Sequence, residues 1–323
     1  MNFKIGQVQK NKLQKVSRKG SAWMWRIFRL LMLIGISYVI IYPLMVELSL
    51  LFMAKEDVFD LTVKWIPRHY SLSNLQISIA LLQYIPSLLK TVGFCLTLSV
   101  LQVISCTMAG YGFARFKFRG NGILFGIVIL TLIIPPQTYI ITLYEHLIYF
   151  DVFGIIRLIT GQPGIKLLDK GILPFALMSA TGTGIKNGLY IYILRQIFRS
   201  LPNELEEAGR VDGANSFKIF SQIMLPNAMP TVLVAFLLSF VWQWNDTFYI
   251  SLFAPEMNLL SVQLQKLIFT VTSYLGGWNT VGDVYTSVLV NTGSFLVILP
   301  LLVLFAFCQR FFVEGVERSG IVG

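Results

Sequence analysis

The sequence predicts an all-α membrane protein with six transmembrane helices and with both termini in the cytoplasm. Two observations carry this prediction. Of 323 residues, 55% are hydrophobic and only 13% are charged, whereas soluble domains carry about 25% charged residues. In addition, several mostly apolar segments are long enough to cross a bilayer, which takes about 20 residues. The expected transmembrane helices are residues 27–53, 86–114, 122–144, 172–194, 228–252 and 287–309.

The distribution of basic residues predicts which ends of these segments face the cytoplasm. Residues 1–26 form a basic tail, and eight Lys or Arg residues precede or open the first segment without one acidic residue. With that tail inside, the cytoplasmic flanks hold seventeen Lys and Arg residues and the outer flanks hold seven. This is the asymmetry of the positive-inside rule. We therefore expect a disordered cytoplasmic N-terminal tail, a six-span domain over residues 27–310 and a cytoplasmic C-terminal tail over residues 311–323.

Composition argues against several other classes of protein. The formal net charge is +10, but the cations gather on the cytoplasmic flanks, so we expect contact with membrane lipid and no nucleic-acid partner. Cys95 and Cys106 would lie on one helix, roughly 16 Å apart, which is too far for a disulfide. The chain has only two His residues, and no ligand spacing typical of a metal site is present. The first apolar segment is too long for a signal-peptide core.

Residues 201–226 form the longest polar stretch in the second half of the chain, and they lie between the fourth and fifth expected spans. They predict two short helices joined by a turn. Ser200 or Asn203 can cap the first helix, and Pro202 fits its first turn. Three glutamates in that turn would interact favourably with the positive end of the helix dipole: Glu204, Glu206 and Glu207.

The turn and the second helix follow from the next residues. Gly213 can adopt the positive φ that ends a helix, and Asp212, Ala214 and Asn215 surround it. Ser216 can cap the second helix, and Pro226 is expected to end it. Four apolar side chains would share one face of this helix: Phe217, Phe220, Ile223 and Met224. Such a stretch is either a linker lying on the lipid surface or a projection that a soluble partner grips in a groove.

The spacing of this stretch matches a known pattern. Glu207-Ala208-Gly209, then Gly213, then Ile223-x-Leu225-Pro226, resembles the EAA loop of permease subunits of bacterial ABC importers. The fuller string resembles the carbohydrate-uptake branch of the binding-protein-dependent transport family, the maltose MalG type; it adds Arg210, Asp212-Gly213-Ala214 and Ile219-Phe220. Gly209 stands where relatives have a second alanine. Glycine costs about 1 kcal/mol of helix stability relative to alanine, so we expect a looser turn there.

The resemblance covers about residues 25–323 and extends to two further motifs. The fifth expected span ends in residues 242–246, Trp-Gln-Trp-Asn-Asp, and its Trp-Asn followed by an acidic residue resembles the same place in sugar permeases. The segment from Gln309 and Arg310 to Gly315 resembles the family's cytoplasmic ending, which in the maltose-type member reaches between two ATPase subunits. The chain lacks the lysine that relatives often place before their last glycine.

The resemblance implies a permease subunit of an ATP-driven, binding-protein-dependent sugar importer in the bacterial cytoplasmic (inner) membrane, with oligosaccharide as the expected substrate class. The implied partners are two ATP-binding cassette ATPase subunits, a homologous second permease subunit and an extracytoplasmic solute-binding protein. The loop over residues 201–226 would couple this chain to the ATPase. Its expected coupling residues are Glu206, Glu207, Ala208, Gly209, Asp212, Gly213, Ala214, Phe220, Ile223, Leu225 and Pro226. Glu207 would meet a cation on the ATPase, and the apolar face would carry most of the docking energy.

The chain itself is not expected to be an enzyme. It has no Walker A loop, no kinase signature, no HExxH and no nucleophile elbow. ATP and Mg²⁺ would therefore be bound by the partner subunit, and this chain would need no cofactor and no metal. A secondary transporter is the alternative, but that class needs its own coupling-ion site, typically with carboxylates near the midplane. Here the acidic residues lie in loops or near span ends.

Several residues in the expected spans are candidates for a substrate path: Gln137, Lys186, Trp244, Asn245, Asp246 and Asn291. Each has a structural alternative. Lys186 can extend its ammonium to the cytoplasmic surface, about two turns away. Asn245 and Asp246 can belong to an interfacial belt, and Asn291 can join helices. Pro135-Pro136 must kink the third span, either for helix packing or to face the substrate.

Overall fold

The computed structural model describes residues 2–152, 154–168, 170–277 and 280–320, and it gives side-chain surroundings within residues 23–310 of these ranges, apart from 280–283. The chain divides into two compact units. Unit 1 comprises Met1–Ile77 and Trp278–Phe295, and unit 2 comprises Ser78–Gly277 and Leu296–Gly323. The described residues are helical, apart from loops and two isolated antiparallel bridges, Met53 with Tyr70 and Phe150 with Ile165.

Unit 1 begins with a single long helix. It contains α1 (Asn2–Leu51), α2 (Lys55–Phe59), the start of α3 (Ser73–Leu81) and the N-terminal part of α15 (Thr280–Gly320). The expectation of a disordered basic tail is wrong, because α1 starts at Asn2 and includes both the tail and the first span. No proline precedes Pro43 in this helix, so nothing interrupts the backbone hydrogen bonds where the polar tail meets the apolar span.

The buried side chain of Asn74 holds the start of the loop that follows α1. Asn74 donates to the carbonyl oxygens of Leu50 at 2.9 Å and Met53 at 2.8 Å, and its Oδ1 accepts from the hydroxyl of Tyr285 at 2.7 Å. These bonds join α3 to the end of α1 and to α15 within unit 1. Because each polar atom of Asn74 has a partner, the side chain can be fully buried at little cost.

Asp57 on α2 holds the remainder of that loop. One carboxylate oxygen accepts from the backbone N–H groups of Arg68 and His69, both at 2.7 Å, and the other lies 2.8 Å from Nδ1 of His69. The hydrogen bond from the His69 backbone, followed by that from its ring, lowers the pKa of Asp57 below its usual value. The hydrogen bonds of this loop therefore favour the charged carboxylate form of Asp57.

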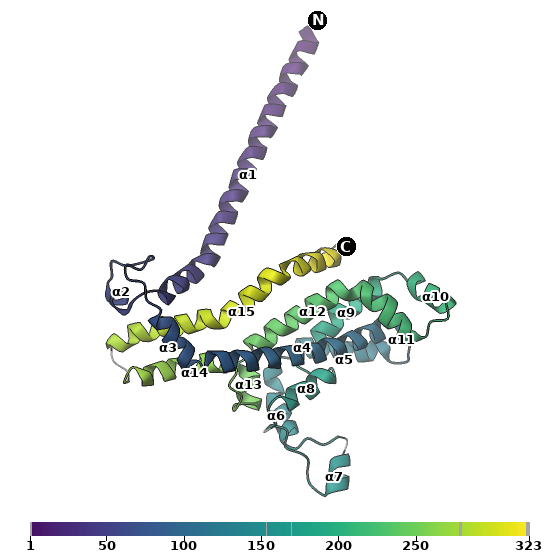
Figure 1. Cartoon of the computed structure of the whole chain (residues 1–323). Helices are drawn as coiled ribbons and strands as arrows, with labels where there is room; N and C mark the ends of the chain where they lie inside the picture. Colours follow the sequence, from purple (N-terminus) through teal and green to yellow (C-terminus); the bar gives the residue numbers. More distant parts are fainter. Residues whose placement is uncertain (1, 153, 169, 278–279, 321–323) are drawn as a thin grey trace. The chain divides into compact units, whose positions relative to one another are not determined.

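Unit 2 is built on one long helix. Figure 1 shows α4 (Tyr84–Arg115) running beside α9 (Asn187–Ser200) and α12 (Leu225–Asn245), and α8 (Leu173–Ala180) also packs on it. The remaining helices of this unit are α5 (Asn121–Ile133), η1 (Pro136–Thr138), α6 (Ile140–Ile148), α7 (Ile155–Thr160), α10 (Glu204–Val211), α11 (Ser216–Ile219), η2 (Phe220–Met224), α13 (Phe248–Phe253) and α14 (Leu260–Tyr274).

The core of unit 2 lies where α4, α9 and α12 meet. Tyr111 of α4 packs edge-on against Phe198 of α9, with ring centroids 5.4 Å apart. Leu194 of α9 and Ala228 of α12 have no exposed surface. This cluster includes Ile219 and Met224, so residues 201–226 are packed directly into the core of the unit.

Four described helices are long and apolar enough to cross a membrane: Trp23–Leu51, Tyr84–Arg115, Ser216–Asn245 and Val284–Arg310. They correspond to the first, second, fifth and sixth expected spans, which confirms an all-helical chain with several membrane-length helices. The fifth begins and ends earlier than expected, since α12 stops at Asn245 and the separate helix α13 follows.

The third and fourth expected spans are each divided, not continuous. In the third, α5 ends at Ile133 and α6 starts at Ile140, with η1 between them. Pro135 and Pro136 cause this, because proline lacks the N–H of a helical hydrogen bond and its ring clashes with the preceding turn. The predicted kink is thus a break.

In the fourth expected span, α8 ends at Ala180 and α9 starts at Asn187. Gly182 and Lys186, in the connecting segment, both have positive φ, +72° and +68°. These values are incompatible with a right-handed helix. Residues 181–188, Thr-Gly-Thr-Gly-Ile-Lys-Asn-Gly, include only one large apolar side chain. The apolar pattern of the expected span is therefore interrupted at this place, and its glycines are a signal for a break.

Candidate functional site

The candidate coupling site is the elbow, which we define as residues 201–226. Its first helix, α10, has Asn203 as its N-cap and three glutamates in its first turn, as predicted. The capping hydrogen bond itself is not formed. Asn203 Oδ1 instead accepts from Nη1 of Arg115, while Ser200 ends α9 and donates to the carbonyl of Ile197. Pro202 precedes the cap and therefore lies outside the helix.

The turn of the elbow is the glycine hinge that the sequence predicts. Gly213 has φ +75° and follows Asp212, the C-cap of α10. Its N–H donates to the carbonyl of Arg210 at 3.0 Å, and the N–H of Ala214 donates to the carbonyl of Gly209 at 2.9 Å. This pair of bonds is the Schellman motif. A side chain with a Cβ would be strained at Gly213, although the space around it is open.

The second helix of the elbow differs from the prediction at both ends. Asn215, not Ser216, is the N-cap, and its Oδ1 accepts from the N–H of Lys218 at 2.8 Å. Pro226 does not end the helix, which continues as α11, η2 and α12 from Ser216 to Asn245. η2 is a π-helical turn, in which the N–H of Leu225 bonds to Phe220 five residues back. This wider turn comes just before the proline and accommodates its ring.

Gly209 brings the two helices of the elbow into contact. A Cβ placed on it would lie 2.8 Å from Cδ1 of Ile223 and 3.2 Å from Cγ1 of Ile219. The residue is buried. The expectation of a looser turn at this position is therefore wrong, because the missing methyl group permits close packing of α10 against the following helix.

A buried ion pair attaches the elbow to α4. Nε of Arg115 lies 3.4 Å from Oε1 of Glu206, and the two side chains are only 7% and 10% exposed. Arg115 Nη2 also donates to the carbonyl of Leu201 at 2.5 Å, and the hydroxyl of Tyr111 lies 3.4 Å from Glu206 Oε1. Arg210 approaches the other oxygen of Glu206 at 3.5 Å. Glu206 is thus a structural residue at the base of the elbow, and it offers little surface to a partner.

The apolar face of the second helix points into unit 2, so it is not free for docking. Ile219 and Met224 are buried, and the ring of Phe220 lies 4.8 Å from that of Tyr111. Ile223 and Leu225 are half-buried beside them, whereas Pro226 is exposed. Only Phe217 of the expected face is exposed. The expectation that this whole face carries docking is therefore wrong.

The exposed end of the elbow is a different set of side chains, which we call the tip. Val211 is 87% exposed and Phe217 is 74% exposed. Glu207, Ala208 and Asp212 are also exposed. An apolar pair with nearby carboxylates is a surface that a soluble partner can cover. Glu207 therefore remains available for the contact that the sequence predicted.

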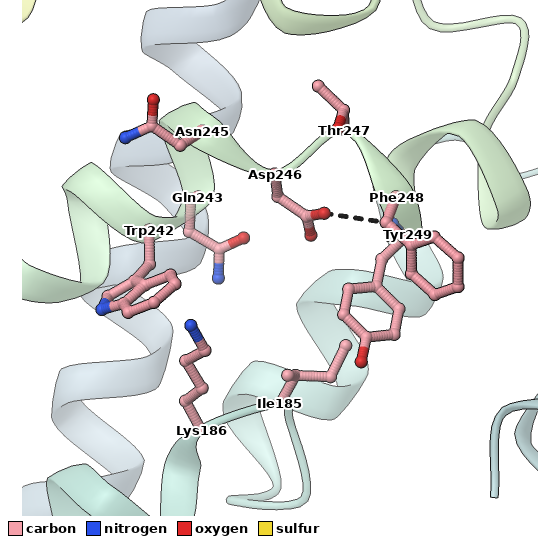
Figure 2. A pocket seen from close by; sticks show the side chains of 9 residues that line it. All are labelled: Ile185, Lys186, Trp242, Gln243, Asn245, Asp246, Thr247, Phe248 and Tyr249. Atoms are coloured by element: carbon pink, nitrogen blue, oxygen red, sulfur yellow. Dashed lines mark hydrogen bonds between the residues drawn. The ribbon is translucent and has the colours of Figure 1, made fainter. Parts of the chain in front are cut away.

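A second candidate site is a polar pocket formed by the α8–α9 connection, the end of α12 and the start of α13 (Figure 2). Its volume is about 230 Å³. The Lys186 ammonium lies over the ring of Trp242, and Asp246 accepts from the N–H of Tyr249 at 3.0 Å. The pocket is lined by Ile185, Lys186, Trp242, Gln243, Asn245, Asp246, Thr247, Phe248 and Tyr249.

The pocket gathers three of the six substrate-path candidates, Lys186, Asn245 and Asp246. Lys186 precedes the 14-residue helix α9, which spans about 21 Å, and its ammonium lies over the ring of Trp242. Trp244 is only 2% exposed and donates to the carbonyl of Val297 at 3.2 Å, so it is a packing residue. Trp242, two residues earlier, is the tryptophan that lines the pocket.

The remaining candidates lie apart from this pocket's lining. Gln137 is exposed on η1, and Asn291 is half-buried on α15 in unit 1. Gln309 and Arg310 belong to the same long helix, which continues past Gly315 to Gly320. The side-chain surroundings of residues 311–320, and all structure of residues 321–323, lie outside the described residues.

Sequence reasoning missed a buried polar network behind the pocket. Gln102 of α4 donates through Nε2 to Asn187 Oδ1 and to the carbonyl of Ile185 at 3.1 Å, while Ser239 of α12 donates to Gln102 Oε1 at 2.5 Å. The network fixes the segment that carries Lys186. One signal was available, since a glutamine in the middle of an apolar helix is costly unless it has partners.

The fold and the elbow together define a multi-span helical membrane protein with a projecting helical loop. Residues 75–319 match the family described as binding-protein-dependent transport system inner membrane component. The chain belongs to this family. It is therefore a multi-pass permease component of the inner membrane within an ABC transporter, and ATP hydrolysis belongs to a separate subunit. The family membership predicted from the elbow is confirmed.

Curated relatives and one solved structure agree with this membership. The maltodextrin transport system permease protein MdxG of Bacillus subtilis is 26% identical over 305 residues, covering 92% of this chain and 96% of that protein. The arabinooligosaccharides transport system permease protein AraQ of Bacillus subtilis is 27% identical over 225 residues, covering 70% and 69%. The crystal structure of a bacterial ABC transporter involved in the import of the acidic polysaccharide alginate has a chain with the same fold, with a TM-score of 0.70 and 18% identity over 90% of this chain and 98% of that one.

Proposed function

We propose that this chain is the permease subunit of an importer that takes up a sugar, with an oligosaccharide as the substrate class. The names of relatives support this, since they include permeases for α-glucosides in Rhizobium meliloti, for arabinooligosaccharides and maltodextrins in Bacillus subtilis, and for trehalose in Mycobacterium tuberculosis. The chain would form half of the translocation pathway. The other half would come from a homologous second permease subunit.

The second part of the proposal is that the elbow docks to the ATPase. Its tip would enter a groove on a separate ATPase, and its base is anchored to α4 by Arg115 and Glu206. Covering Val211 and Phe217 would contribute about 1.5–3 kcal/mol for each side chain. Glu207 would add a surface ion pair worth about 0–1 kcal/mol. Docking energy would therefore come mainly from two exposed apolar side chains, and the ion pair would fix the orientation.

Six membrane crossings fit this role when the divided segments are counted. The third crossing would be α5, η1 and α6, and the fourth would be α8 and α9. Broken helices are tolerated at membrane depth where the freed backbone groups are buried in protein or line a cavity. The fourth fits this rule, because Gln102 accommodates the break and the pocket lies beside it. Both termini and the elbow would then be cytoplasmic.

The proposed assembly has two ATPases, two permease subunits and one extracytoplasmic solute-binding protein. In this arrangement the domain over residues 27–310 lies in the membrane, and the end of α15 continues into the cytoplasm. Gln309, Arg310 and Gly315 would make a second contact with the ATPase pair. Movement of the ATPases on binding ATP would shift the tip, and the elbow would transmit that shift to α4 and α12.

Copurification tests the docking proposal. The transporter is expressed with this subunit tagged, and the amount of ATPase recovered with it is measured for wild type, Val211→Asp and Phe217→Asp. Each change should reduce ATPase recovery several-fold, because a carboxylate would replace a covered apolar group. Phe269→Ala is the matched control, since Phe269 is 69% exposed on α14 and should have no effect. Wild-type recovery from both variants would contradict the proposal.

A further inference from the structure

The pocket beside Trp242 combines the groups that bind a sugar ring. An exposed indole face can stack on the apolar face of a pyranose, and amide and carboxylate groups can bond its hydroxyls. Trp242 is half exposed, and Gln243, Asn245 and Asp246 also line the pocket. The volume of about 230 Å³ is below the roughly 300–1,000 Å³ of pockets that hold drug-sized ligands. This space suits one sugar ring and not a whole oligosaccharide.

The charges of this pocket favour an uncharged ring. Its lining contains one cation, Lys186, and one anion, Asp246, and these cancel. A uronate would have to place its carboxylate near Asp246 while its only cationic partner lies over the indole. A neutral sugar avoids this conflict, because its hydroxyls can donate to Asp246 and accept from Lys186.

The side chain of Lys186 occupies the space over the indole of Trp242 in which a sugar ring would stack. Its ammonium lies over the ring of Trp242, and Figure 2 shows the Lys186 side chain pointing toward that indole. Its backbone has φ +68°, a conformation that a side chain other than glycine adopts at a cost. The hydrogen bond from Gln102 to the neighbouring carbonyl of Ile185 holds this segment in place. Strain maintained by surrounding contacts is typical of functional positions.

From these observations we infer that this subunit itself contacts the transported glycan, that the pocket holds one neutral sugar ring against Trp242, and that Lys186 is the group the ring displaces from the indole. The inference rests on the proposed function and deepens it. When no sugar is present, the ammonium closes the aromatic face. When a ring enters, the ammonium moves off the indole to the ring hydroxyls, and Asp246 accepts from them.

The test uses the complete transporter, with ATPase, second permease and binding protein, in proteoliposomes. Maltotriose and arabinotriose serve as neutral probes and trigalacturonate serves as the acidic probe. With binding protein at saturation, Trp242→Ala should lower the maximal rate for the transported neutral probe about 10-fold. Trp242→Phe should restore most of it, because a ring face remains. Phe269→Ala, an exposed aromatic on α14, is the control.

A second measurement remains informative if Trp242→Ala assembles poorly. Gln243→Cys is made in a Cys308→Ser background, where the two remaining cysteines are buried, and its labelling by a maleimide is followed in the assembled transporter. The transported neutral probe should slow labelling severalfold. Lys186→Met should strengthen this protection at low sugar concentration, because the competing ammonium is gone.

The outcomes separate the two proposals. Transport of a neutral probe at the wild-type rate by Trp242→Ala, with no protection of Gln243→Cys, overturns the sugar site and leaves the importer function intact. Transport of trigalacturonate alone overturns the neutral-ring assignment. Failure of the wild-type transporter to move any of the three probes counts against the sugar importer and against the site together.

Discussion

Removing Arg115 should destabilise the elbow more than any other single change to its base. The variant Arg115→Met keeps an apolar stem but deletes the ion pair with Glu206 and two hydrogen bonds, to the Leu201 carbonyl and to Asn203. Removing one partner of a buried pair costs about 3–5 kcal/mol, because the other charge is left uncompensated. Arg210 still lies 3.5 Å from Glu206, so the lower half of that range is expected.

Glu206→Gln should cost less than Arg115→Met. Arg115 keeps its bonds to Leu201 and Asn203 in this variant, and only the charge of its third partner is lost. A buried group left partly unsatisfied costs about 1–3 kcal/mol. The double variant should be less destabilised than the sum of the two single variants, by about 1–3 kcal/mol, since the groups touch.

The assay is the midpoint of thermal unfolding of the purified subunit in detergent. For a domain of 150–250 residues, 1 kcal/mol corresponds to about 2–4 °C, and this shift becomes smaller in longer chains. Arg115→Met should therefore lower the midpoint by several degrees. Arg119→Met is the matched control, because Arg119 is an exposed cation in the loop after α4. Equal midpoints for Arg115→Met, Arg119→Met and wild type would refute the reasoning, as would full additivity in the double variant.

Three further predictions follow from particular backbone and side-chain positions. Gly213→Val should make the elbow more sensitive to limited proteolysis, because a Cβ at φ +75° costs about 1–2 kcal/mol; Gly213→Asn should be tolerated, and equal cleavage of all three proteins would contradict this. Gly209→Ala should destabilise the wild type, because the new Cβ would lie 2.8 Å from Cδ1 of Ile223. In an Ile223→Val background the same change should stabilise the protein by up to about 1 kcal/mol through helix propensity. Thermal midpoints of the wild type, the two single variants and the double variant test both expectations. The pKa of Asp57 is lowered in the folded chain, so its contribution is complete above the usual Asp value of about 3.9 and is lost as pH falls toward its folded pKa; Asp57→Asn should flatten thermal stability between pH 7 and 3, and an unchanged profile would contradict it.

The family and the hinge could be predicted because both depend on local residue order. Gly213 needs only its own φ to end α10, and the glutamates of α10 need only their position in the first turn. The long apolar helices α4 and α15 were equally predictable, since length and hydropathy specify them. These features require no knowledge of what packs against them.

The roles of individual side chains could not be predicted in the same way. Glu206 and Glu207 are adjacent glutamates, yet one is buried beside Arg115 and the other is exposed. That difference depends on where α4 ends, ninety residues earlier in the chain. Trp242 and Trp244 show the same limit, because only the packing of α12 decides which indole faces the pocket and which donates to Val297.

Pro226 lies inside a helix instead of ending it, and this affects how movement can pass along the chain. The π-helical turn before it keeps Ser216–Asn245 as one unbroken helix of 30 residues, about 45 Å long. Phe217 lies at one end of this rod and Trp242 near the other. In the proposed transporter, a displacement of Phe217 would therefore be carried to the pocket by one continuous helix, and Pro230 inside it is the position where a bend would reduce the transmitted movement.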